Sequence, residues 1–327
     1  YNSLSKCLFF QANEKRAQTM NAIQIVTPAE LAAAELGFDT SILAGSLAAS
    51  SMATYAKDFR AYLQYAGSAG RALDAETLAQ WRAHLATNTT LSPNTINRMI
   101  AAVKRLVKEA AAQGYCSREL SLAFQDVAGV KVKALKARQK AHARTLITPE
   151  DMRRICTAPN ANTLPGRMHR ALLATLASSG CRISEVVSLT PAQIHFGQDE
   201  SSREGFYIEV MGKNQTEPRR APISPEAHRL IEQWLAARSA AGVSSEHVFT
   251  GFGGRGGRQP RVSPIHPASA WEMVQRYARA CNLAHVKPHD FRRFVGTRLA
   301  KDNIRNAQKV LGHKRLETTA AHYVLDD

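Results

Sequence analysis

Hydrophobic positions in the first half of the chain recur every three or four residues, the period of an amphipathic helix. One series begins near residue 50, and a second covers residues 78–85. A third is better delimited, because Ser92 is a good N-cap, Pro93 suits the first helical position and Gly114 suits the end. The apolar positions of the three series are Tyr55, Phe59, Tyr62, Leu63, Leu78, Trp81, Leu85, Ile96, Ile100, Val103 and Val107. They predict a small helical domain over residues 44–128.

The second half of the chain predicts further helices and one short sheet. Thr148 followed by Pro149 is typical of a helix start. Residues 206–210 alternate between apolar and polar, residues 212–214 suit a turn and residues 219–223 return, which predicts a β-hairpin. Other predicted helices cover residues 164–178, 183–189, 225–238, 267–281, 289–301, 303–311 and 318–325, and we interpret the glycine-rich run 252–258 as a loop. The predicted fold class is α+β, mainly α with a small β-hairpin or sheet, with a second domain over residues 146–327.

Charge changes this picture by pointing to a polyanionic partner. The chain of 327 residues has a net charge of +16. Residues 1–128 hold twelve basic against ten acidic side chains, whereas residues 129–145 hold six basic and no acidic ones, so we predict an extended basic linker there. Because Lys and Arg gain affinity by displacing the counterions of phosphate, nucleic acid is the favoured partner. The predicted contacts to the DNA backbone are Arg98, Lys104, Arg105, Lys108, Lys131, Lys133 and Lys136.

Several classes of protein are disfavoured by composition. The apolar stretches are far shorter than the roughly 20 residues of a membrane span, and no signal peptide is recognisable, so we expect a cytoplasmic, nucleoid-associated protein without a membrane partner. The five cysteines are widely spaced and form no metal-binding pair, so we expect no metal. Residues 1–43 are interpreted as an N-terminal extension, with residues 1–19 preceding a native start at Met20.

A set of dispersed polar residues suits the attack of a tyrosine on a phosphodiester. A phenol of pKa about 10 is scarcely ionised at neutral pH and needs cations and imidazole beside it. Two guanidinium groups match the two non-bridging oxygens of phosphate, and a lysine at a hairpin tip can protonate the departing oxygen. The predicted catalytic residues are Arg182, Lys213, His289, Arg292, His313 and Tyr323, with Glu185 orienting an arginine or a histidine. The spacing leaves the division of proton transfer between the two histidines open.

These residues occur in motifs that resemble those of the tyrosine recombinases, the phage-type integrases together with the Xer and Cre recombinases. The matching motifs are Gly180-Cys181-Arg182-Ile183-Ser184-Glu185, Met211-Gly212-Lys213, His289-Asp290-Phe291-Arg292, Leu311-Gly312-His313 and Tyr323. The resemblance runs from about residue 44 to the end. It implies a helical DNA-clamping domain followed by a catalytic domain.

The resemblance also implies a reaction and an assembly. The reaction is site-specific recombination, in which a strand is cut to a 3′-phosphotyrosine and a free 5′ hydroxyl and rejoined to a partner strand through a Holliday junction. The DNA partner is a duplex with inverted-repeat half-sites, on which a homotetramer joins two sites. The resemblance implies neither a small-molecule substrate nor a cofactor. Integration, excision, resolution and inversion share this chemistry and remain open.

Two departures and two alternative functions accompany the resemblance. The interval from His313 to Tyr323 is one residue longer than we expect of the family. Many relatives continue past the position of Asp327 with a helix that packs into a neighbouring subunit, so we expect a trimmed chain or different assembly contacts. The alternatives are a DNA-relaxing enzyme similar to type IB topoisomerases and a DNA-binding protein of the same fold that does not cut.

Overall fold

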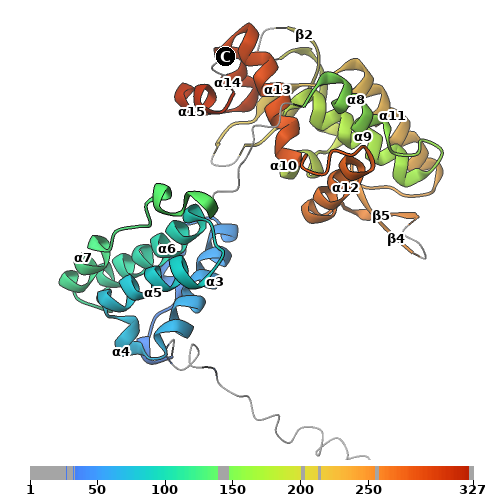
Figure 1. Ribbon diagram of the computed structural model, residues 1–327. Helices are drawn as coiled ribbons and strands as arrows, with labels where there is room; N and C mark the ends of the chain where they lie inside the picture. Colours follow the sequence, from blue (N-terminus) through green and yellow to red (C-terminus); the bar gives the residue numbers. More distant parts are fainter. Residues whose placement is uncertain are drawn as a thin grey trace, which may run out of the picture. The chain divides into compact units, whose positions relative to one another are not determined.

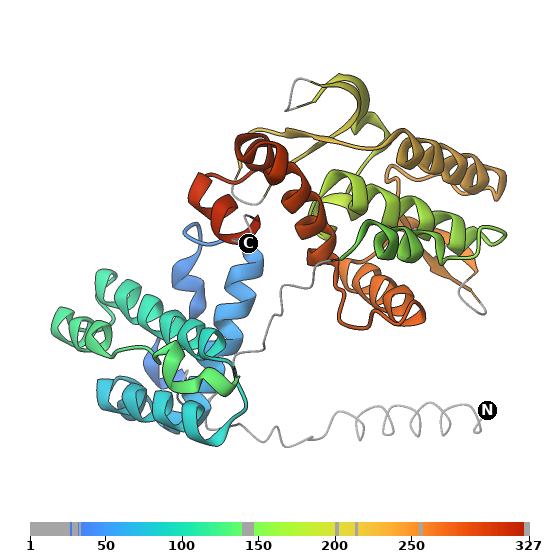
Figure 2. The same cartoon turned by 45° about the horizontal axis from the view of Figure 1, so that its top comes forward.

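The chain folds into two compact units, Tyr1–His142 and Ala143–Asp327 (Figures 1 and 2). The computed structural model describes residues 27, 32, 34–138, 147–199, 203–212, 215–254 and 258–323, apart from the side chains of Lys136, Ala321 and His322. Within these ranges, no helix combines the length and the apolar character that crossing a membrane requires.

The first unit packs its helices around one apolar core. Its elements are η1 (Thr40–Leu43), α3 (Ala49–Ala66), α4 (Ala69–Ala72), α5 (Ala75–Asn88), α6 (Pro93–Ala112), α7 (Arg118–Asp126) and η2 (Val132–Arg138). The predicted apolar face of α6 is buried, including Ile96 and Val103. Ser92 Oγ accepts the backbone N–H of Thr95 at 3.2 Å, and Gly114 has a left-handed φ of 84° just beyond the helix. The predicted start and end of this helix are confirmed, because both depend on local backbone requirements.

Two features of the first unit differ from the sequence interpretation. Phe38 and Leu43 are buried in its core, so the packed region begins before residue 44. Residues 132–138 are not extended but form 3-10 turns with a kink at Leu135. Leu135 is partly buried against the same core, and this apolar contact holds part of the basic segment to the unit.

The second unit is built around one buried helix, α9. Its elements are α8 (Pro149–Thr157), α9 (Leu164–Ser179), α10 (Ile183–Val187), η3 (Pro191–Gln193), β1 (Ile194–Gln198), β2 (Glu204–Val210), β3 (Arg219–Pro222), α11 (Pro225–Ala240), β4 (Thr250–Gly253), β5 (Gln259–Pro264), α12 (Pro267–Ala280), α13 (Pro288–Asp302), α14 (Ile304–Leu311) and α15 (Leu316–Tyr323). Leu172, Leu173 and Leu176 of α9 are fully buried, and α8, α11 and α13 pack on this helix. The predicted mainly helical α+β class is confirmed.

Short antiparallel sheets complete the second unit. The predicted hairpin is formed by β2 and β3, and β1, which we did not predict, adds a third strand with Phe196 opposite Phe206. The prediction of a loop over residues 252–258 is wrong at its start, because Phe252 and Gly253 belong to β4, whereas its end agrees with β5, which begins at Gln259. The glycines in this run led us to predict a loop instead of strands. The two strands are held together beside the buried residues Phe249 and Ile265, which are joined by a backbone hydrogen bond of 3.0 Å.

Candidate active site

Arg182 lies between two helices of the second unit. Gly180 ends α9 with a left-handed φ of 62°, and Arg182 is the N-cap of α10. Glu185 holds this arginine in two ways, since its Oε2 accepts the Arg182 backbone N–H at 2.9 Å and its Oε1 accepts Nη1 at 2.8 Å. The carboxylate is buried, whereas the Arg182 side chain is 37% exposed. The guanidinium is therefore oriented by a fixed anion and still accessible to an incoming phosphate.

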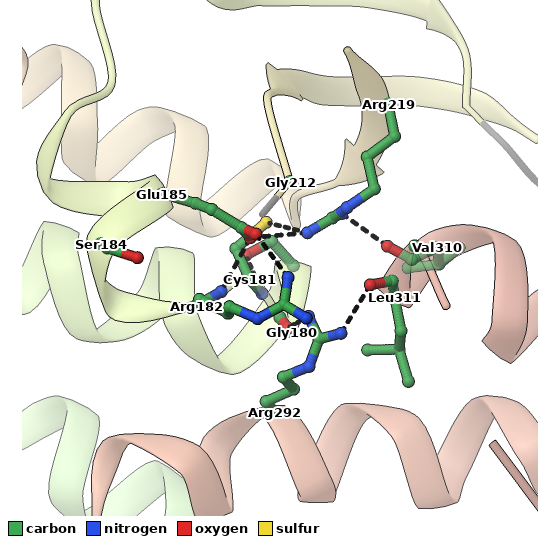
Figure 3. A network of polar contacts seen from close by, with 12 residues as sticks. Gly180, Cys181, Arg182, Ser184, Glu185, Gly212, Arg219, Arg292, Val310 and Leu311 are labelled. Atoms are coloured by element: carbon green, nitrogen blue, oxygen red, sulfur yellow. Dashed lines mark hydrogen bonds and ion pairs between the residues drawn. The ribbon is translucent and has the colours of Figure 1, made fainter. Parts of the chain in front are cut away.

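Arg292 of α13 is 1% exposed, so its charge needs compensation within the protein. Its Nη1 donates to the carbonyl of Gly180 at 3.0 Å, and its Nη2 donates to the carbonyl of Leu311 at 2.5 Å (Figure 3). Nη2 also lies 3.1 Å from Nε2 of His313. Burial lowers the pKa of Arg292, and the electrostatic interaction with Tyr323 opposes that shift. Arg292 thus joins the ends of α9 and α14 and contacts His313.

His313 and Tyr323 form a stacked pair. Their ring centroids are 5.5 Å apart with an interplanar angle of 24°. His313 follows Gly312, which ends α14 with a left-handed φ of 67°, and its Nδ1 lies 2.9 Å from Thr319 Oγ1. Because the Arg292 guanidinium can only donate, Nε2 of His313 is the acceptor and Nδ1 carries the proton donated to Thr319.

The tyrosine ring depends on a glycine for its place. Tyr323 is 3% exposed, and its ring lies against Gly296 of α13. A Cβ added at Gly296 would lie 2.4 Å from Cδ1 and 2.5 Å from Cε1 of Tyr323. Since real Cβ atoms do not approach so closely, only glycine at this position admits the observed ring.

His289 lies in the first turn of α13 with part of its ring exposed. Desolvation by neighbouring atoms lowers the pKa of His289, and the charges of Arg292, Arg293 and Arg182 lower it further. The neutral ring therefore predominates at neutral pH. A neutral imidazole is the form that can accept a proton.

Lys213 lies outside the described residues, but both flanks of its turn are described. The backbone N–H of Gly212 donates to Oε1 of Gln215 at 3.0 Å. Nε2 of the same glutamine donates to the carbonyl of Gly312 at 3.2 Å. The base of the turn that carries Lys213 is therefore tied to the residue before His313.

The basic residues proposed to contact DNA differ in their environments. Arg98 forms an ion pair with the buried Asp58, whose pKa is raised by burial and lowered in part by that arginine. Nζ of Lys104 donates to the carbonyl of Gln125 at 2.8 Å. The side chains of Arg105, Lys108, Lys131 and Lys133 are exposed, and that of Lys136 lies outside the described side chains. Among the six of these residues whose side chains are described, Arg98 and Lys104 thus have partners within the first unit.

The sequence interpretation missed Arg219. It lies on β3 and is 5% exposed, and its Nη2 donates to Oε2 of Glu185 at 2.7 Å. The only signal was the alternation of the strand, which turns Arg219 and Ala221 inward and Arg220 outward.

The chain matches the family model described as Phage integrase family over residues 145–327, and the model described as Phage integrase, N-terminal SAM-like domain, over residues 38–114. It is 26% identical over 278 residues to the tyrosine recombinase XerD of Halalkalibacterium halodurans, covering 81% of this chain and 84% of that protein. It is 32% identical over 179 residues to the tyrosine recombinase XerC of Myxococcus xanthus, covering 52% of this chain and just over half, 54%, of that protein.

Solved structures of similar fold include two complexes with DNA. One is the XerH site-specific recombinase bound to difH substrate in a pre-cleavage complex, with a TM-score of 0.61 and 18% identity, covering 85% of this chain and 76% of that one. The other is the Tn1549 transposon integrase in complex with circular intermediate DNA, with a TM-score of 0.62 and 17% identity, covering 92% of this chain and 96% of that one. Because the integrase model alone spans more than half of the residues, the chain belongs to the phage integrase family, that of the tyrosine recombinases.

Proposed function

We propose that this chain is a site-specific DNA recombinase in which Tyr323 is the nucleophile. One observation carries the proposal: Arg292 contacts the ends of α9 and α14 and also His313, whose ring stacks on Tyr323. Arg292, His313 and Tyr323, which are distant in sequence, are thereby gathered in one network, and Arg182 is linked to the end of α14 through Glu185 and Arg219. That combination suits the attack of a phenol on a phosphodiester.

In the proposed reaction, the Tyr323 oxygen forms a bond to phosphorus and the bond to the 5′ oxygen of DNA breaks. The products are a 3′-phosphotyrosine and a free 5′ hydroxyl. Because the pKa of His289 is lowered, its ring is neutral at neutral pH and can accept the phenol proton. Lys213 gives a proton to the departing 5′ oxygen. Attack of a partner strand's 5′ hydroxyl reverses these transfers, and two such exchanges pass through a Holliday junction.

The two arginines stabilise the charge that develops on the non-bridging oxygens. Arg182 is accessible to a phosphate, while Arg292 is held in place by two carbonyls. Guanidinium groups fixed before the substrate arrives need no reorganisation during the reaction, which is why such groups accelerate phosphoryl transfer. His313 keeps the tyrosine ring beside Arg292.

Binding of DNA is proposed to involve both units. The first unit, whose packed region includes Phe38 and Leu43, would form a helical clamp, residues 129–145 a basic segment along the phosphate backbone, and residues 146–327 the catalytic domain. Exposed Lys131 and Lys133 suit contacts to phosphate, which position a protein without reading sequence. Four protomers on two paired sites, each built of inverted half-sites, complete the proposal, and such a protein would work in the cytoplasm at the nucleoid.

Capture of covalent protein–DNA adducts tests this function. The full chain and Tyr323→Phe are incubated with fragmented DNA of the source organism and denatured, and the ends of the protein-linked fragments are sequenced. Adducts at one inverted-repeat sequence that vanish with Tyr323→Phe are expected. Adducts at scattered sequences would instead indicate a topoisomerase-like enzyme, and no adducts with the unaltered chain would indicate a protein that only binds DNA.

A further inference from the structure

Arg219 is a charged residue in the interior of the second unit. Arginine is rarely buried unless its charge is paired, yet this side chain is 5% exposed while its neighbour Arg220 is exposed on the other face of β3. A buried arginine is therefore expected to have a negatively charged or hydrogen-bonding partner. Figure 3 shows its guanidinium pointing toward Glu185 and the end of α14.

The contacts of Arg219 connect the two elements that hold the catalytic arginines. Its Nη2 donates to Oε2 of Glu185 at 2.7 Å and lies 3.5 Å from Sγ of Cys181. Its Nη1 donates to the carbonyl of Val310 at 2.5 Å. Glu185 binds Arg182, and the residue after Val310 supplies the carbonyl that binds Arg292. One guanidinium therefore bridges the supports of both catalytic arginines.

A close approach to Gly312 is a second sign that this bridge is built into the fold. A Cβ added at Gly312 would lie 2.7 Å from Cδ and 2.8 Å from Nε of Arg219. Gly312 also has a left-handed φ of 67°, which favours glycine, and it precedes His313. The turn that carries His313 thus leaves room for the stem of Arg219.

We propose that Arg219 is a positioning residue, which fixes Arg182 through Glu185 and fixes Arg292 and His313 through the carbonyl end of α14. The inference rests on the proposed function, since it concerns how the same site is held. Glu185 shares its charge between two guanidinium groups and neutralises neither completely. Arg182 is thereby held in one orientation and keeps positive charge for the phosphate.

Lysine cannot replace this bridge. The guanidinium presents five donors in a rigid fork, so one arginine reaches the carboxylate and the carbonyl together, whereas an ammonium group is a point charge on a flexible stem. Arg219→Lys keeps the charge and should lose one of the two connections. A role that depended on charge alone would be preserved by this substitution.

The test compares Arg219→Met and Arg219→Lys with Arg220→Met, a matched control on the outward face of β3. The substrate is a duplex of the sequence recovered by adduct capture, nicked beside the cleavage point so that the adduct accumulates. A second duplex carries a methylphosphonate at the scissile position, where a neutral methyl group replaces one charged oxygen. Because this group develops less negative charge, its cleavage depends less on correctly placed arginines.

We expect both Arg219 variants to form the adduct with the ordinary phosphodiester about 100-fold more slowly, the size of effect seen when one oxyanion donor is lost. On the methylphosphonate the loss should be at least tenfold smaller, and Arg220→Met should remain within about twofold of the unaltered chain on both substrates. Arg219→Lys keeps most of the buried stem, so it provides the measurement if Arg219→Met does not fold.

Three outcomes would overturn the inference. Equal losses on both substrates would make Arg219 merely structural, and Arg219 variants that cleave like the unaltered chain would deny it any role. In both cases the unaltered chain still cleaves through Tyr323, so the proposed function stands. If the unaltered chain forms no adduct dependent on Tyr323, the proposed function itself fails, and the inference fails with it.

Discussion

Replacing Arg292 by alanine should destabilise the second unit as well as stop cleavage. The substitution removes a charged donor from the carbonyls of Gly180 and Leu311, and each buried acceptor left without a partner costs about 1–3 kcal/mol, or about 2–6 kcal/mol together. The space left by a side chain that is 1% exposed adds to this loss.

Arg182→Ala provides the matched comparison. Its side chain is 37% exposed, and Glu185 would keep Arg219 as a partner, so the change should reduce the free energy of unfolding by roughly 0–1 kcal/mol. Both substitutions should slow adduct formation on the order of a thousandfold, because each removes a guanidinium that stabilises the charge of the transition state.

Urea denaturation of the full chain and the rate of covalent adduct formation measure the two effects separately. DNA affinity should change little for Arg182→Ala, since its guanidinium acts mainly on the transition state. A surface substitution usually changes the free energy of unfolding by no more than about 0.5 kcal/mol. If Arg292→Ala changes it by no more than that, our account of the buried hydrogen bonds of Arg292 is refuted. If Arg182→Ala lowers the free energy of unfolding as much as Arg292→Ala does, the predicted difference between the buried and the accessible arginine is refuted.

Three further predictions address neighbouring parts of the molecule. Gly296→Ala should displace the nucleophile's ring and slow adduct formation at least tenfold, with about 1–3 kcal/mol of overpacking cost in denaturation, whereas Gly205→Ala, which has open space, should do neither. Neutralising Lys131 and Lys133 together should weaken binding to every DNA sequence and reduce the salt slope by about 2 in a titration by fluorescence anisotropy; an unchanged slope would remove them from the interface. Because the pKa of His289 is lowered, the cleavage rate should rise with pH below 6.5 and be level above it, and a rise beginning only above pH 7 would exclude this ring as the base.

Elements whose signals are local were predictable from the sequence. The helix that starts after Ser92 and the one that starts after Thr148 were placed because a capping side chain and a proline act within one turn. Strands β1, β4 and β5 were missed, since each is stabilised by pairing with another segment and two of them flank a glycine-rich run. The burial of Phe38 in the first unit is likewise a long-range contact that no local pattern reveals.

The sequence by itself determined which chemical groups this protein possesses, and the order and spacing of Arg182, Arg292, His313 and Tyr323 were enough to indicate their chemistry. Only the tertiary structure decided how they are held. The bond from Arg292 to the carbonyl of Gly180 joins residues 112 positions apart, and the one from Arg219 to Glu185 joins residues 34 apart. Such contacts form when α9, β3, α13 and α14 pack around one core. The sequence lists the residue types, but the fold determines which groups pair with a buried charge, because burying an unpaired charge in the protein core costs too much free energy.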